Sequence, residues 1–178
     1  ATAEAAGDDR ALFNGINRSL DNDDVATFKS GFGVAKFTNF KTDGSAGHDA
    51  TFPDADFFLM RAAEAYLNFA EADARINGGQ TTKEGTEAIN AIRKRANASP
   101  REDKGYSLND ICDEWSREFY FEGRRRMDLI RFNRFGGNVN YNWQWKGGTK
   151  EGRNFSKDLN IFAIPTNELT SNKNLIQN

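Results

Sequence analysis

Apolar residues in the segment 54–77 recur with the period of an α-helix, and this pattern constrains the fold more than any other feature of the sequence. Intervals of three and four residues return to the same side of a helix. Pro53 before Asp54 favours a helix start, and Gly78-Gly79 favours an end because glycine adopts the left-handed conformation at low cost. We therefore predict an amphipathic helix over residues 54–77. Its apolar face consists of Leu59, Ala62, Ala63, Tyr66, Phe69 and Ala70.

A second helix is predicted from Thr81 to about Asn97. Thr81 and Glu84 stand three residues apart at its start, which is the spacing of a capping box, where each side chain bonds the other residue's backbone amide. Pro100 stops the helix, because proline lacks the amide hydrogen that a helix interior needs. The apolar face of this helix consists of Ala88, Ile89, Ile92 and Ala96.

Two more helices are predicted on either side of Gly123. The third opens at Ser107, with Asp110 forming a weaker capping box. Glycine at position 123 interrupts the pattern, and a shorter fourth helix is predicted over residues 124–134. The apolar stripe of the third helix consists of Leu108, Ile111, Cys112, Trp115 and Phe119.

The segments that flank these helices lack sustained helical periodicity. Residues 1–53 are rich in Gly, Asp and Thr, with a short extended segment at 31–40, and residues 136–178 are irregular, with a brief extended piece at 161–165. We predict one mainly α domain: tetratricopeptide-like helix pairs in residues 54–135, irregular loop-rich flanks and little β-structure. The helix pair is longer than the repeat unit of about 34 residues. Its outer stripe, including Leu59, Tyr66 and Phe69, is predicted to lack a neighbour.

Charge and residue counts exclude several kinds of protein. Lys and Arg total 24 and Asp and Glu total 26, so the net charge of −2 argues against a nucleic-acid binder. No apolar run is long enough to span a bilayer. Cys112 is the only cysteine, which excludes an intrachain disulfide, and it is predicted to be a small core residue. His48 is the only histidine, which excludes a two-histidine metal site and a histidine-based triad. We predict no metal and no cofactor.

Glutamates recur every four residues along the third predicted helix, at positions 114, 118 and 122. Paired carboxylates are the groups that glycoside hydrolases use. The spacing along one helix face, among arginines, favours a structural ion-pair network instead. The predicted network, which includes Arg117 as a partner, otherwise consists of Glu118, Glu122, Arg124, Arg125, Arg126, Asp128 and Arg131.

Aromatic and amide residues alternate in the sequence Tyr141-Asn142-Trp143-Gln144-Trp145. In an extended chain, alternate residues share a face, so the three rings would line one side and the two amides the other. Planar rings stack on sugars and amides bond their hydroxyls, so Tyr141, Trp143 and Trp145 are the candidate ligand-binding residues. The alternative is that these rings pack against the body of the protein, which is the commoner fate of large aromatic side chains.

Four ordered motifs resemble the SusD/RagB family. The segment FFLMRAAEAYLNFAEA at 57–72 is similar to that family's R-x-A-E-x-x-L-x-x-A-E-A helix, and AINAIRKRA at 88–96 to its N-x-I-R-x-R-A helix. REFYFEGRRRMDLIR at 117–131 resembles the R-E-x-x-x-E-G-x-R-x-x-D-L-x-R signature. IPTNELTSNKNLIQN at 164–178 resembles the closing run of the family. Motifs in this order over residues 57–178 make the resemblance specific.

The resemblance implies a non-catalytic lipoprotein at the cell surface, anchored in the outer membrane of a Bacteroidetes bacterium. Such proteins bind an oligosaccharide or polysaccharide and deliver it to a SusC-like TonB-dependent transporter. Their signal peptide and lipidated cysteine are not expected in this chain, which opens with ATAEAAGDDR, and both ends are expected to be cuts in a longer chain. The resemblance therefore also implies that upstream segments supply much of the ligand-binding face. Two alternatives are a tetratricopeptide-like protein-interaction module and, less favoured, a glycoside hydrolase.

Overall fold

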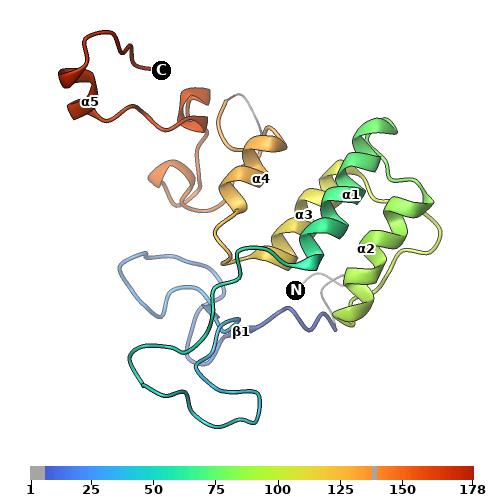
Figure 1. Ribbon diagram of the computed structural model, residues 1–178. Coiled ribbons are helices and arrows are strands. Elements are labelled where there is room, and N and C mark those ends of the chain that lie inside the picture. Colours follow the sequence, from blue (N-terminus) through green and yellow to red (C-terminus); the bar gives the residue numbers. More distant parts are fainter. Residues whose placement is uncertain (1–6, 138–139) are drawn as a thin grey trace. The chain divides into compact units, whose positions relative to one another are not determined.

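The computed structural model describes residues 7–137 and 140–178, and the chain forms two compact units, residues 1–125 and 126–178. Helices dominate, which confirms the mainly α class (Figure 1). Within the described residues, the only sheet is one antiparallel pair of two-residue strands, with Phe13 opposite Val34. The strands and α-helices are β1 (Phe13–Asn14), β2 (Gly33–Val34), α1 (Ala62–Ile76), α2 (Lys83–Arg95), α3 (Leu108–Phe119), α4 (Arg125–Arg131) and α5 (Thr166–Ser171).

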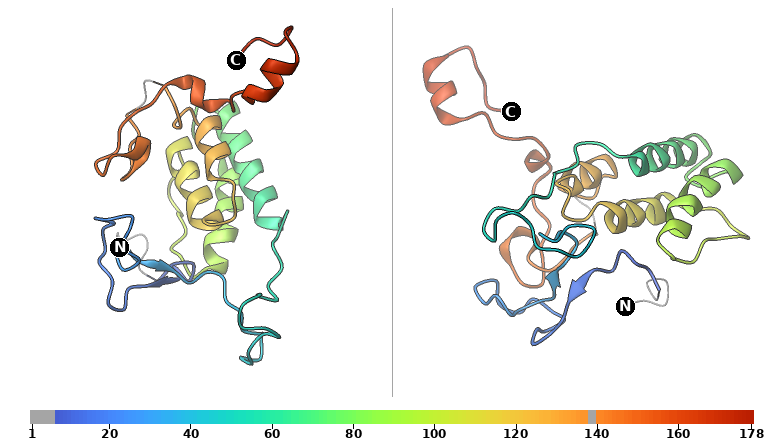
Figure 2. Two further views of the ribbon diagram at one scale, coloured as in Figure 1. Left: turned by 90° about the vertical axis from the view of Figure 1, so that its left-hand side faces the viewer. Right: turned by 60° about the horizontal axis from the view of Figure 1, so that its bottom comes forward.

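The core of the first unit lies between α1, α2 and α3. Helix α1 contacts both α2 and α3, and the two views in Figure 2 show the three helices side by side. Small alanines on α1 permit the close approach that helix packing requires. Cys112 is buried in this core, as predicted. The most buried apolar side chains of the three helices are Leu67, Ala70, Ala74, Ile89, Ile92, Ile111, Cys112, Trp115 and Phe119.

Helix α1 begins eight residues later than predicted. Residues 54–60 precede it as exposed loop, and Arg61, its N-cap, has extended backbone angles (φ −150°, ψ 157°). The guanidinium of Arg61 binds Glu118 and Glu122 of the region around α3, and these ion pairs hold the residue outside the helix. Leu59 therefore belongs to a loop, and not to the helical stripe on which the sequence pattern placed it.

One of the two predicted capping boxes forms and the other does not. At α3, the Ser107 hydroxyl accepts from the Asp110 amide, and the Asp110 carboxylate accepts from the Ser107 amide at 2.8 Å. At α2, the N-cap is Thr82, with no side-chain cap bond. The Asp73 carboxylate at the end of α1 accepts from both the amide and the hydroxyl of Thr82, at 2.7 and 2.9 Å. The predicted box at Thr81 is wrong because this tertiary contact replaces it; Thr81 bonds the Thr86 hydroxyl instead.

The second unit is irregular. Helix α4, which spans the boundary between the units, ends at Arg131, three residues earlier than predicted. Beyond it come two short 3₁₀ turns, Lys146–Gly148 and Lys157–Asn160, and the short helix α5. Residues 161–165 pair in no strand, and Ile161 has the extended backbone angles expected for this piece (φ −111°, ψ 142°). Across the part of the chain that the structure describes, every helix is too short or too polar to cross a membrane.

Candidate functional site

The three glutamates of the α3 region are held in a dense network of ion pairs. Glu114, fully buried, pairs with Arg10 (2.7 Å), Arg93 (2.8 Å) and Arg117 (2.8 Å). Glu118 is buried almost as deeply, and its partners are Arg10, Arg61 and Arg95. Glu122 pairs with Lys36 (2.5 Å) and Arg61 (2.8 Å). The cations therefore come from the N-terminal loops, the start of α1 and the end of α2, and Arg117 comes from α3 itself.

The observed partners match the predicted network in part: the pairs Arg117–Glu114 and Arg131–Asp128 form within the predicted cluster. Arg117 does pair with Glu114, but Arg124 pairs with Glu64 at 2.9 Å and Arg125 donates to the Cys112 carbonyl oxygen at 2.8 Å. In the second unit, Arg126 donates to the carbonyl oxygens of Leu159 and Asn160, and Arg131 pairs with Asp128 at 2.9 Å. Sequence neighbours were the natural candidates, whereas Arg10, Lys36 and Arg61 lie 57 or more residues away from the glutamates that they bind.

The electrostatics of the glutamate row disfavour acid–base catalysis. Burial alone would raise the pKa of Glu118, but hydrogen bonds from Arg61, Arg95 and Arg10 hold that pKa below its ordinary value. The pKa values of Glu114 and Glu122 are lowered in the same way, by cationic neighbours that outweigh burial: arginines at Glu114, and Arg61 with Lys36 at Glu122. A glycosidase needs one carboxylic acid with a raised pKa to protonate the leaving group. The lowered pKa values of all three carboxylates favour a structural role for the row.

The aromatic loop, which we define as residues 140–155, presents a partly exposed tryptophan. The Trp143 side chain is 38% exposed, and the Tyr141 ring meets it edge to face, with ring centroids 6.2 Å apart and planes at 63°. The amide residues Asn142 and Gln144 are both exposed. An exposed ring and exposed amides within one loop are group types suited to a sugar, whose apolar face stacks on a ring and whose hydroxyls bond amides.

The predicted arrangement of three rings on one face is wrong at Trp145. Residues 144 and 145 form a turn, and Trp145 has left-handed backbone angles (φ 67°, ψ 4°). Alternation of faces requires an extended chain, so it ends at Trp143. Trp145 is half-buried, which favours the packing interpretation for this ring. Tyr141 and Trp143 are thus the pair that the structure brings together.

Backbone hydrogen bonds within the aromatic loop fix its shape. The Lys146 amide donates to the Trp143 carbonyl oxygen at 3.1 Å, and the Arg153 amide donates to the Lys146 carbonyl oxygen at 2.9 Å. Gly152 has φ +74°, and a side chain there would collide with the Trp143 carbonyl group. Glycine is therefore required where the returning chain passes Trp143.

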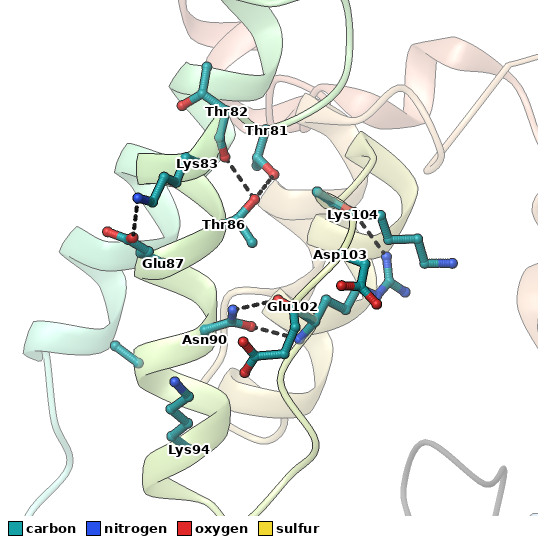
Figure 3. A pocket seen from close by; sticks show the side chains of 13 residues that line it. Thr81, Thr82, Lys83, Thr86, Glu87, Asn90, Lys94, Glu102, Asp103 and Lys104 are labelled. Carbon is teal, nitrogen blue, oxygen red and sulfur yellow. Dashed lines mark hydrogen bonds and ion pairs between the residues drawn. The ribbon is translucent and has the colours of Figure 1, made fainter.

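Another candidate site is a hollow between α2 and the loop at residues 101–105, which polar residues line (Figure 3). Its deeper groups bond one another: Thr81 and Thr86 share a hydrogen bond, and Asn90 accepts from the Arg101 amide and donates to the Arg101 carbonyl oxygen. None of the residues that line it is aromatic, so it offers no ring for a sugar to stack on. The aromatic loop is the better candidate. Within residues 7–137 and 140–178, no group of three or more His, Cys, Asp or Glu side chains is arranged to hold a metal ion.

Paired helices joined by a glutamate–arginine network define the class: a helical, tetratricopeptide-like protein. The chain belongs to the SusD family, whose profile matches residues 5–178. It is 42% identical over 179 residues to the starch-binding protein SusD of Bacteroides thetaiotaomicron, an alignment that covers 98% of this chain and 31% of that relative.

Solved structures show the same fold. Surface glycan-binding protein A from Bacteroides uniformis matches with a TM-score of 0.56 and 27% identity, over 79% of this chain and 30% of its own. A SusD superfamily protein from Parabacteroides distasonis matches with a TM-score of 0.59 and 19% identity, over 97% of this chain and 39% of its own, and supports the fold alone. The chain thus spans about a third of the length of each of these relatives.

Proposed function

We propose that this chain is part of a non-catalytic protein that binds a glycan at the cell surface. The observation that carries the proposal is its 42% identity, over nearly its whole length, to a starch-binding relative. The exposed Trp143 beside Asn142 and Gln144 supplies a surface of the right chemistry. The ionised state of the glutamate row supports binding without hydrolysis. Starch and its malto-oligosaccharides are the first ligands to test.

The proposal extends to location and partner. As in the SusD family at large, the protein would be a lipid-anchored lipoprotein of the outer membrane, and it would pass its glycan to a SusC-like TonB-dependent transporter. Affinity purification from outer membranes tests this part: a TonB-dependent barrel should co-purify with the protein. Recovery of the protein without such a barrel, in cells grown on the glycan, would contradict the partnership.

Titration calorimetry of the protein with maltoheptaose, and with a panel of other polysaccharides, tests the binding proposal. We expect saturable binding without release of reducing sugar. Trp143→Ala should weaken affinity by up to about tenfold, since loss of aromatic stacking costs about 0.5–1.5 kcal/mol. Phe28→Ala, which removes an exposed ring outside the aromatic loop, is the matched control and should leave affinity unchanged. Release of reducing sugar would show a hydrolase, and absence of binding across the panel would contradict the proposal.

A second candidate function is protein docking, with a second copy of this chain as the partner to test, and one feature favours it. Tyr66 and Phe69 are about half exposed on α1, and with Ala65 and Ala88 they line an apolar hollow between α1 and α2. Exposed apolar patches of this kind mark interaction surfaces. Replacing both rings by serine should reduce self-association in light scattering while leaving glycan affinity unchanged. Loss of glycan affinity in that variant would place the glycan site here instead.

A further inference from the structure

Lys146 is the most unusual residue of the second unit, because a lysine is rarely buried. Its exposed fraction is 1%, although Lys side chains almost always keep their ammonium group in water. Burial lowers the pKa of this ammonium, so the surroundings must compensate for the lost water. The compensation comes from the aromatic loop itself.

The ammonium of Lys146 links the first and last segments of the aromatic loop. It donates to the Tyr141 carbonyl oxygen at 2.7 Å and to the Asn154 side-chain oxygen at 3.1 Å. These acceptors stand five residues before it and eight residues after it, at the two ends of the loop. One buried side chain therefore closes a segment that contains only loop, turns and the short 3₁₀ helix Lys146–Gly148.

The same ammonium also lies over two aromatic rings. It is 4.8 Å from the centroid of the Trp143 ring and 5.2 Å from that of the Phe155 ring. A cation within about 6 Å of a ring centroid is attracted by the negative face of the ring. The hydrogen bond from the Lys146 amide thus holds the backbone of Trp143, and the Lys146 ammonium contacts the face of its ring.

We infer that Lys146 is the positioning residue that holds Trp143 in the orientation required to stack on a sugar. This inference rests on the proposed function, and it adds that the affinity of the site depends on a residue that glycan does not touch. A preorganised ring loses less freedom on binding than a mobile one, so the ligand gains affinity from the buried lysine. Arginine is not expected to position Trp143 in the same way, because its planar guanidinium is larger than the compact ammonium that this site encloses.

A double-mutant cycle tests the inference. Lys146→Met keeps the length of the side chain and removes its charge, and it should weaken binding of maltoheptaose by up to about tenfold, as Trp143→Ala does. The double variant should be no weaker than Trp143→Ala alone, because the lysine acts only through that ring. Lys150→Met, an exposed lysine of the same loop, is the matched control and should bind as the wild type does. Additive losses in the double variant would overturn the inference, because Lys146 would then act independently of Trp143.

A readout that needs no glycan separates the two proposals. In protein labelled with 5-fluorotryptophan, Lys146→Met should shift and broaden the ¹⁹F signal of Trp143, which is identified by its absence in Trp143→Phe. The signal of Trp115, in the helical core, should not move, which also shows that the variant is folded. An unchanged Trp143 signal would overturn the positioning role even if the protein binds glycan. A shifted signal in a protein that binds no glycan would support the positioning role and defeat the proposed function alone.

Discussion

Trp115 and Trp143 place the same side chain in two opposite environments. Trp115 lies on α3 with 0% exposure, its indole N–H donates to Glu71 at 2.9 Å, and its ring packs on Phe119. Trp143 lies in a loop, 38% exposed, and is held by one tyrosine and one lysine. A ring that is enclosed on all sides contributes to stability, whereas a ring with a free surface is available to a ligand. The same residue type therefore has different roles at positions 115 and 143, and the surroundings of each ring determine its role.

The largest expected effect tests the enclosed ring. Trp115→Ala should lower the free energy of unfolding by about 3–5 kcal/mol, since it empties a fully buried aromatic site and leaves Glu71 without its indole donor. Thermal and urea melts followed by circular dichroism measure the change. Trp115→Phe, which keeps most of the volume, should lose clearly less. A loss below about 1 kcal/mol for Trp115→Ala would show that the α3 core tolerates a cavity and that the contrast with Trp143 is false.

The next effect concerns the glutamate network of the helical unit. Glu118→Ala should cost about 3 kcal/mol, because it removes a buried carboxylate that Arg10, Arg61 and Arg95 share and so weakens the compensation of those cations. Glu122→Ala should cost about 2 kcal/mol, since this carboxylate has fewer cationic partners. Glu87→Gln is the matched control, because the Glu87–Lys83 pair is exposed at 3.9 Å and should contribute almost nothing. Equal melts for Glu118→Ala and Glu87→Gln would refute the structural role.

Acid should weaken the same network. The pKa values of Glu114, Glu118 and Glu122 in the folded protein lie below the ordinary value of 4.5. The unfolded chain therefore binds more protons as pH falls through that value, so stability is full above it and is lost as pH falls toward the folded pKa values. Melting temperature should drop between pH 6 and pH 3, and it should drop less in Glu118→Ala, which has one fewer such carboxylate. If the melting temperature of Glu118→Ala drops as much as that of the wild type, groups other than this carboxylate cause the loss of stability in acid.

The helical core could be predicted from the sequence because its signals are local. The stripe of α3, the burial of Cys112 and the capping box at Ser107 each depend on residues within one or two turns of one another. The predicted start of α1 was wrong for the opposite reason, because it depends on distant residues. Arg61 is held in an extended conformation by carboxylates 57 and 61 residues further along the chain, and no local pattern reports such a partner.

The candidate site was predicted only in part, for the same physical reason. The alternation of rings and amides pointed to Trp143, but the left-handed turn at Trp145 is set by how the whole loop closes on itself. Lys146 gave no local signal of burial, since a lysine in a glycine-containing loop is ordinarily exposed. Its neighbours Gly147 and Gly148, both with positive φ, were the available hint of a tight turn.

The smallest expected effect on stability belongs to the exposed ring, and it decides the comparison. Trp143→Ala should lower the free energy of unfolding by less than Trp115→Ala does, because 38% of the Trp143 surface already lies in water whereas Trp115 is fully buried. Trp145→Ala should cost more, since that ring is half-buried in a turn. Melts and maltoheptaose titrations on each variant separate the roles. A Trp143→Ala loss of about 3–5 kcal/mol with affinity kept in the folded fraction would show that this ring, like Trp115, serves packing.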